Sequence, residues 1–106
     1  MAYDERLAER VRRVLDGRPS ITERRMFGGL AFMVDGHMAC GVLRDELIVR
    51  VGSESDAALA DPHARPFDFT GRPTRGMVYV APRGVATDAD LERWVARGVA
   101  SVGSRR

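Results

Sequence analysis

Asp35 and Gly36 separate two short apolar segments, LAFMV and HMACGV, and this dipeptide constrains the fold more than any other feature of the sequence. Asp-Gly is a preferred pair for a two-residue type I′ turn, because both central residues of that turn take a positive φ. A second reversal is expected at Arg44-Asp45, before the segment ELIVRV. Two tight turns fix the register of three antiparallel strands, and the register determines which side chains share a face.

Turns of two residues predict a specific set of opposed positions. The expected pairs are Met33 with Met38, Phe32 with Ala39, Val42 with Leu47, and Cys40 with Val49. One face should then form the core that the helices cover, with Ala31, Met33, Met38, Cys40, Val42, Leu47, Val49 and Val51. The other face should carry Leu30, Phe32, Val34, Ala39, Gly41 and Ile48, a set too apolar for a sheet face that only meets water.

The rest of the chain reads as helices and two further strands. Apolar residues at helical spacing predict a first helix from about Asp4 to Leu15 and a last helix that begins after a Thr87 cap. A short helix is expected near Ser53 to Leu59, and strands are expected around Phe67-Phe69 and over MVYV. The order α-βββ-α-ββ-α predicts an α+β fold, a two-layer domain with a mostly antiparallel five-stranded sheet.

Length and composition indicate one soluble domain over residues 1–106, with a core from about 4 to 102 and a flexible tail at 103–106. All 17 basic residues are arginine, yet 15 acidic residues are interspersed with them and the net charge is only +2. No apolar run approaches the ~18 residues of a membrane span, and the first residues do not resemble a secretory signal. The single cysteine, Cys40, favours a reducing cytoplasm.

The side chains that could act in catalysis or bind a metal do not form a recognisable motif. The segment RRMFGG has a glycine pair, but it leads into a strand rather than a helix. Gly28-Gly29 is therefore interpreted as permitting a bulge or a close backbone approach instead of forming a phosphate loop. His37 and Cys40 point to opposite faces of an extended strand and cannot share one metal ion. The sequence therefore predicts no catalytic residues, no cofactor and no metal.

Several segments taken together resemble a known family. RRMFGGLAFMVDGHMACGV, the following ELIVRV, and PFDFTGRPTRGMVYVAP are similar to the N-terminal domain of the TfoX/Sxy family, bacterial regulators of competence. The resemblance implies a two-layer α/β fold with an antiparallel sheet and a regulatory role through protein contacts, since family regulators act with the cyclic-AMP receptor protein. Those regulators carry a second, helical C-terminal domain, so this chain is expected to be a short, stand-alone member.

The leading hypothesis is a non-enzymatic regulatory domain that binds a protein partner, either another protein or a second copy in a homodimer. The alternative is a nucleic-acid-binding accessory module that uses surface arginines, which the low net charge disfavours. The candidate interaction residues are Leu30, Phe32, Val34, Ile48, Arg24, Arg25 and Arg75.

Overall fold

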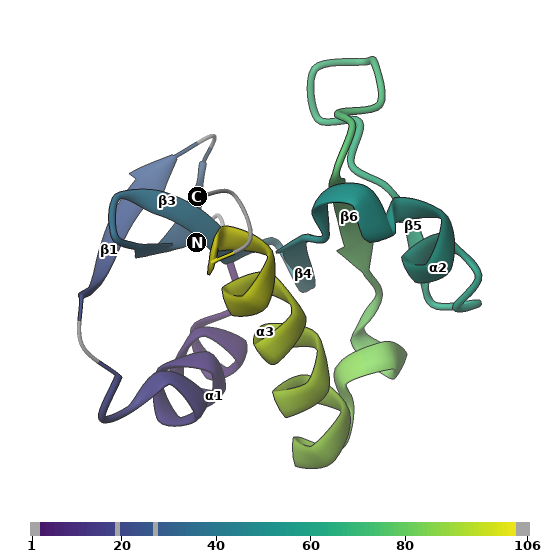
Figure 1. Cartoon of the computed structure of the whole chain (residues 1–106). Coiled ribbons are helices and arrows are strands. Elements are labelled where there is room, and N and C mark those ends of the chain that lie inside the picture. The colour runs from purple at the N-terminus through teal and green to yellow at the C-terminus, as the bar shows by residue number, and fades with distance from the viewer. Residues whose placement is uncertain (1–2, 19, 27, 104–106) are drawn as a thin grey trace.

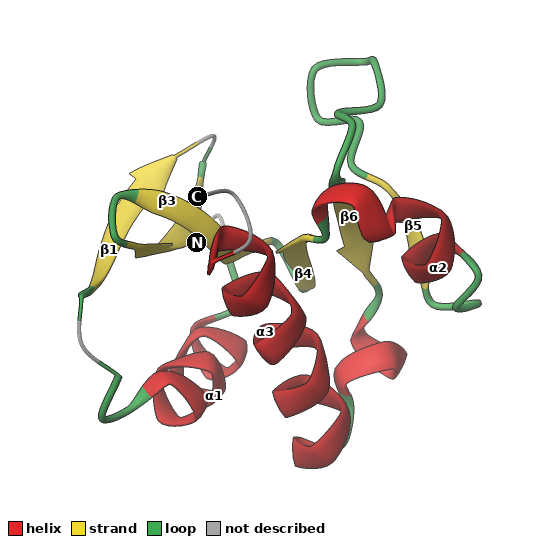
Figure 2. Cartoon of the chain, in the orientation of Figure 1, coloured by secondary structure: helices red, strands yellow, loops and turns green. Residues whose placement is uncertain are grey.

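A computed structural model describes residues 3–18, 20–26 and 28–103, so Phe27 of the glycine-pair motif and residues 104–106 of the expected tail lie outside it. The described residues form an α+β domain with one open, fully antiparallel sheet in the strand order β1-β2-β3-β4-β6-β5 (Figures 1 and 2). The sheet has six strands rather than the five expected. The fold class is thus confirmed, and the strand count is corrected.

The expected order of elements holds apart from the extra first strand, and the strand expected around Phe67-Phe69 lies earlier, at Ala64–Pro66. The strands are β1 (Ile21–Met26), β2 (Gly29–Val34), β3 (His37–Leu43), β4 (Glu46–Arg50), β5 (Ala64–Pro66) and β6 (Met77–Val80). The helices are α1 (Glu5–Leu15), α2 (Ser55–Leu59) and α3 (Asp88–Gly103), with short 3-10 turns η1 (Gly52–Glu54) and η2 (Pro82–Val85).

The additional strand is β1, whose sequence ITERRM gives no alternating apolar pattern. It lies at one edge of the sheet and pairs with β2 alone, so most of its side chains stay exposed. Its turn into β2 contains Gly28 at a φ of +79°, a conformation that favours glycine. Gly28 thus serves the reversal between β1 and β2, where the sequence had favoured a bulge or a close backbone approach.

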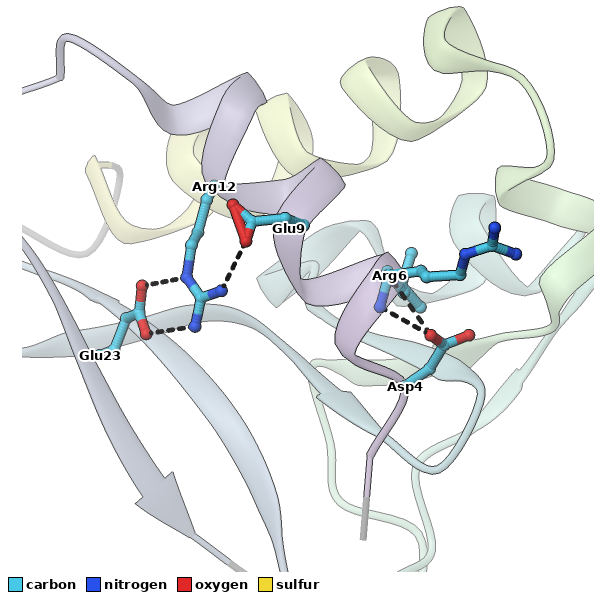
Figure 3. A network of polar contacts seen from close by, with 6 residues as sticks. Asp4, Arg6, Glu9, Arg12 and Glu23 are labelled. Carbon is cyan, nitrogen blue, oxygen red and sulfur yellow. Dashed lines mark hydrogen bonds and ion pairs between the residues drawn. The ribbon is translucent and has the colours of Figure 1, made fainter. Parts of the chain in front are cut away.

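All three α-helices contribute to one buried cluster on a single face of the sheet. Residues of α1, α2, α3 and η2 share this cluster with strand residues such as Cys40, Val42, Leu47 and Val49. The Asp4 carboxylate caps α1 by accepting from the amides of Arg6 and Leu7 (Figure 3), and the Thr87 hydroxyl accepts from the Asp90 amide at the start of α3. The expected stripes of both long helices are confirmed.

Both predicted turns are present, but the register of the first hairpin changes within its length. Asp35 and Gly36 have positive φ, and Met33 lies opposite Met38 as expected. The ladder then shifts, so that Phe32 pairs with Cys40 and not with Ala39. One extra residue on β3 is the signature of a β-bulge, which the turn rules alone do not predict. In the second hairpin, the expected pairs of Val42 with Leu47 and Cys40 with Val49 are confirmed.

The bulge reverses part of the expected face assignment. Leu30 and Phe32 lie in the helix-covered cluster at 4% and 0% exposure, whereas the sequence placed them on the opposite face. Ala31, Met33 and Met38, expected in the helix-covered core, belong to the other face. The physical reason is the side-chain period of two, because one inserted residue moves every later position to the opposite face.

Helix α3 approaches β3 very closely beside the bulge. A Cβ atom placed on Gly98 would lie 2.3 Å from the Ala39 carbonyl oxygen, far inside van der Waals contact. Glycine is otherwise unfavourable in a helix interior by roughly 1 kcal/mol relative to alanine. Gly98 therefore serves the packing of α3 against the sheet backbone.

The corrected register predicts that Phe32→Glu abolishes folding, because the new carboxylate would be buried among apolar helix side chains without a partner. Val34→Glu, two residues further along the same strand and partly exposed, should cost far less. Urea unfolding followed by circular dichroism measures both. A stably folded Phe32→Glu protein would show that this face of β2 is not the core.

The close approach of α3 predicts that Gly98→Ala destabilises the protein by about 1–3 kcal/mol in spite of the better helix propensity of alanine. Gly103→Ala is a matched control in the same helix, since a Cβ at Gly103 meets nothing within 4 Å. The comparison requires only thermal melts of the two variants beside the parent protein. Equal melting temperatures for both variants would contradict the described packing.

Candidate interaction surface

The face of the sheet opposite the helices carries a second apolar cluster, here called the helix-free face. Its buried members come from the strands and from the residue that follows β5, and among the described residues no helix contributes to it. It consists of Ala31, Met33, Met38, Leu43, Ile48, Phe67 and Tyr79, with Met26 and Met77 partly buried at its margin. The expectation that one apolar face would lack a helical cover is thus confirmed, with corrected membership.

Methionine is concentrated on this face. Of the five methionines in the sequence, the four after the first residue all belong to the helix-free cluster. Methionine has an unbranched, polarisable side chain that adapts to irregular partners, and it is over-represented at adaptable binding surfaces. These side chains pack against one another in the free chain, since Met33 and Met38 are only 7% and 6% exposed.

An aromatic ladder runs along the β5–β6 side of the helix-free face. The Tyr79 and Phe67 ring centroids lie 4.9 Å apart, and Phe69 stacks on Phe67 with centroids 6.3 Å apart. Tyr79 is buried, whereas Phe69 is 45% exposed. The loop that carries Phe69 projects beyond the strands, away from α1 and α3 (Figure 1).

An arginine side chain lies over the Tyr79 ring. The Arg65 guanidinium carbon lies 4.2 Å from the Tyr79 ring centroid. Arg65 donates to Glu46 at 2.6 Å, and this hydrogen bond raises the pKa of the guanidinium, which also lies 3.6 Å from Asp68. Burial raises the pKa of Tyr79, so the ring stays neutral beneath the guanidinium.

The candidate arginines do not form one patch. Arg24 and Arg25 lie on β1, where Arg24 faces Ala31 of the helix-free face and Arg25 faces Leu30 of the helix-covered face. Arg75 lies in the loop before β6 and lines a surface hollow of about 470 Å³ with Arg50 and Asp56. Because β1 and β5–β6 are at opposite ends of the strand order, the arginine patch considered from sequence is divided between two edges.

Glu23, next to Arg24, is held by helix α1. Arg12 donates two hydrogen bonds to the Glu23 carboxylate at 2.7 and 2.9 Å, and a third to Glu9 at 3.1 Å (Figure 3). This contact lowers the pKa of Glu23 and raises that of Arg12. The Arg12 guanidinium thus joins α1 to β1 and neutralises the only acidic side chain of the edge strand.

The remaining interaction candidates from the sequence divide by face. Ile48 belongs to the helix-free face as expected, but it is fully buried there. Val34 is partly exposed at the end of β2, and Leu30 and Phe32 lie in the helix-covered core. Sequence reasoning did not select Phe69 or the methionines, although the alternation of Phe67 and Phe69 and the methionine content were visible signals.

Groups with catalytic or metal-binding potential are dispersed in the described part of the chain. No group of three or more His, Cys, Asp or Glu side chains there is close enough to hold a metal ion. Cys40 is fully buried, and desolvation raises the pKa of its thiol to about 12. Within residues 3–18, 20–26 and 28–103, none of the helices has the length and apolar character of a membrane span.

Burial of Cys40 predicts very slow alkylation of the native protein. The thiolate is the reactive species, and a pKa near 12 leaves very little of it at pH 8. Iodoacetamide at that pH should label the native protein at least about a hundredfold more slowly than the urea-unfolded protein, followed by mass spectrometry. Similar rates in the two states would mean that Cys40 is accessible.

Comparison with known proteins identifies one relationship. A family model described as the TfoX N-terminal domain matches residues 13–102. No curated protein and no solved structure matches the chain.

Proposed function

Since the chain belongs to the TfoX N-terminal domain family, we propose that it is a non-enzymatic regulatory domain that binds another protein through the helix-free face. One observation carries the proposal, namely the Phe69 ring, which is 45% exposed and stacks on Phe67 of the methionine-rich cluster. Exposed aromatic rings joined to a buried apolar base are frequent anchors of protein–protein interfaces.

The dispersion of reactive groups supports a binding role over a catalytic one. Cys40 is buried with a strongly raised thiol pKa, so it lacks the character of a nucleophile. The two histidines are on separate elements, His37 at the start of β3 and His63 before β5. A single buried thiol also suits a reducing compartment, and we place the domain in the cytoplasm on that ground.

The partner is proposed to be a different protein rather than an obligate second copy. Buried members of the helix-free face are at most 7% exposed in the single chain. A permanent homodimer usually requires an interface of ~1,200 Å² or more with an apolar centre, and the free chain offers only a few exposed apolar side chains. A contact that forms around Phe69 and displaces the Arg65 side chain fits a regulated, reversible association better.

Nucleic-acid binding receives less support. A phosphate backbone requires several arginines along one continuous track. Arg24 and Arg25 are separated from Arg72 and Arg75 by the full width of the strand order, and the overall net charge is +2. Electrophoretic mobility of mixed DNA at low salt tests this alternative directly.

The proposed function predicts that Phe69→Asp removes the partner, because a charged side chain cannot enter the apolar contact. Tagged wild-type and variant chains are expressed in the native cell, and proteins retained at physiological salt are quantified by mass spectrometry. We expect at least one protein to be retained by the wild type and to fall about tenfold or more with Phe69→Asp.

Leu59→Asp is the matched control, because Leu59 and Phe69 are the exposed large hydrophobic residues in the described chain and Leu59 lies on α2. This variant should retain the same partner as the wild type. An identical set of proteins on all three chains, or none on the wild type, contradicts the proposal. Circular dichroism checks that each variant is folded.

A further inference from the structure

Among the described residues, none pairs with the backbone hydrogen-bonding groups on the outer side of β1. The Asp35 amide donates to the Ser20 carbonyl, and the ladder continues from there with Ile21 opposite Val34. In an antiparallel pair, successive residues direct their backbone groups alternately toward and away from the neighbouring strand. Ser20, Thr22, Arg24 and Met26 therefore point toward β2, and Ile21, Glu23 and Arg25 direct their N–H and C=O groups outward.

This edge is long enough to accept another strand. It extends over six residues, about the usual length of a strand in a globular sheet. The opposite edge, β5, has three residues, one of which is a proline. In the described part of the chain no element pairs with the outer side of β1.

The charge along the edge is positive on both faces. Arg24 and Arg25 are exposed, and neither makes an ion pair or side-chain hydrogen bond to another described residue. The preceding residue, Glu23, is already neutralised by Arg12 of α1. An incoming strand thus meets one unpaired guanidinium on the helix-free side and one on the helix-covered side.

A second copy of this chain does not match that pattern. Pairing of two β1 strands about a two-fold axis must keep both sets of helices on one side, so only positions of the same face can be opposed. In the register centred on Arg24, this arginine opposes its own copy, and like charges placed directly opposite are destabilising. Glu23 of each copy then lies opposite Arg25 of the other, but each glutamate is already held by Arg12. In the register centred on Glu23, Arg24 and Arg25 lie opposite Thr22 and Ile21 and gain no carboxylate. Charged edge residues commonly protect a sheet from self-pairing in this way.

We propose that the outer edge of β1 binds an extended acidic segment of a protein partner, which adds to the sheet as a further strand. Adjacent residues of a strand point to opposite faces, so two consecutive acidic residues would place one carboxylate beside Arg24 and the other beside Arg25. The backbone groups of Ile21, Glu23 and Arg25 supply main-chain hydrogen bonds, and the two arginines supply selectivity. The same arginines that disfavour pairing with a second copy attract this acidic segment.

This inference rests on the proposed role in protein binding but uses a different surface from Phe69. The probe is a fluorescein-labelled, C-terminally amidated peptide, Thr-Val-Glu-Glu-Val-Thr, and binding is measured by fluorescence anisotropy at low salt. The wild-type chain should bind it, and Arg24→Glu/Arg25→Glu should weaken binding about tenfold or more. Phe69→Asp should bind as the wild type does, which separates failure of the edge site from failure of the helix-free face.

Two controls separate strand addition from general charge attraction. Arg72→Glu/Arg83→Glu makes the same change in net charge at exposed positions away from β1 and should leave binding within about twofold. A peptide with proline in place of both valines keeps its charge but loses backbone donors and should bind about tenfold or more weakly. Equal loss in both double variants, or equal binding of the proline peptide, overturns the proposal.

Solution state supplies a further decisive outcome. Sedimentation of the wild-type chain without peptide should show no dimer that depends on Arg24 and Arg25. A dimer that the double variant dissociates would assign the edge to a second copy instead. A single-stranded oligonucleotide that binds in place of the acidic peptide, and loses affinity in the same variant, would assign it to nucleic acid. Circular dichroism confirms that the double variant is folded.

Discussion

One inserted residue in β3, at Ala39, sets which residues of the first hairpin meet the helices. On the turn side of the bulge Met33 and Met38 are opposed on the helix-free face, and on the other side Phe32 and Cys40 are opposed within the core. The Ala39 carbonyl at this point lies against Gly98 of α3, where no Cβ fits. The position of the helix and the two-sided apolar character of the sheet both depend on this local irregularity.

The sequence allows prediction of whatever is determined by local chemistry. The Asp35-Gly36 turn, the Thr87 cap and the helix stripes each follow from the preferences of a few adjacent residues, and all are present. The bulge could not be predicted, because both registers of LAFMV against HMACGV oppose apolar residues. The edge strand β1 was not counted for a related reason, since its ITERRM sequence is stabilised by pairing with β2 rather than by an apolar face.

The sequence predicted that an apolar sheet face would lack a helix, but it assigned mostly the wrong residues to that face. The tight turns correctly indicated that one apolar face would have no helix, because three helices suffice to cover only one side. The residues named for it came from the wrong side of β2, and Ile48 alone among the buried candidates stays on the expected face. The exposed ring of Phe69 depends on a loop whose path sequence periodicity does not describe. A family match over residues 13–102 establishes ancestry, whereas the surface itself had to come from the arrangement of the strands.

The Arg12 contact with Glu23 affects the local unfolding of the domain. Strand β1 is joined to the rest of the molecule by one ladder and this ion pair, with little apolar burial of its own, so it should be among the first segments to open in local fluctuations. Its departure would uncover β2, in which Leu30, Ala31 and Phe32 form a continuous apolar run along a new edge. Such edges are templates for intermolecular pairing and fibril growth. The polar strand thus shields the apolar run of β2 from pairing with other chains, and the Arg12 guanidinium on α1 helps to hold it in place.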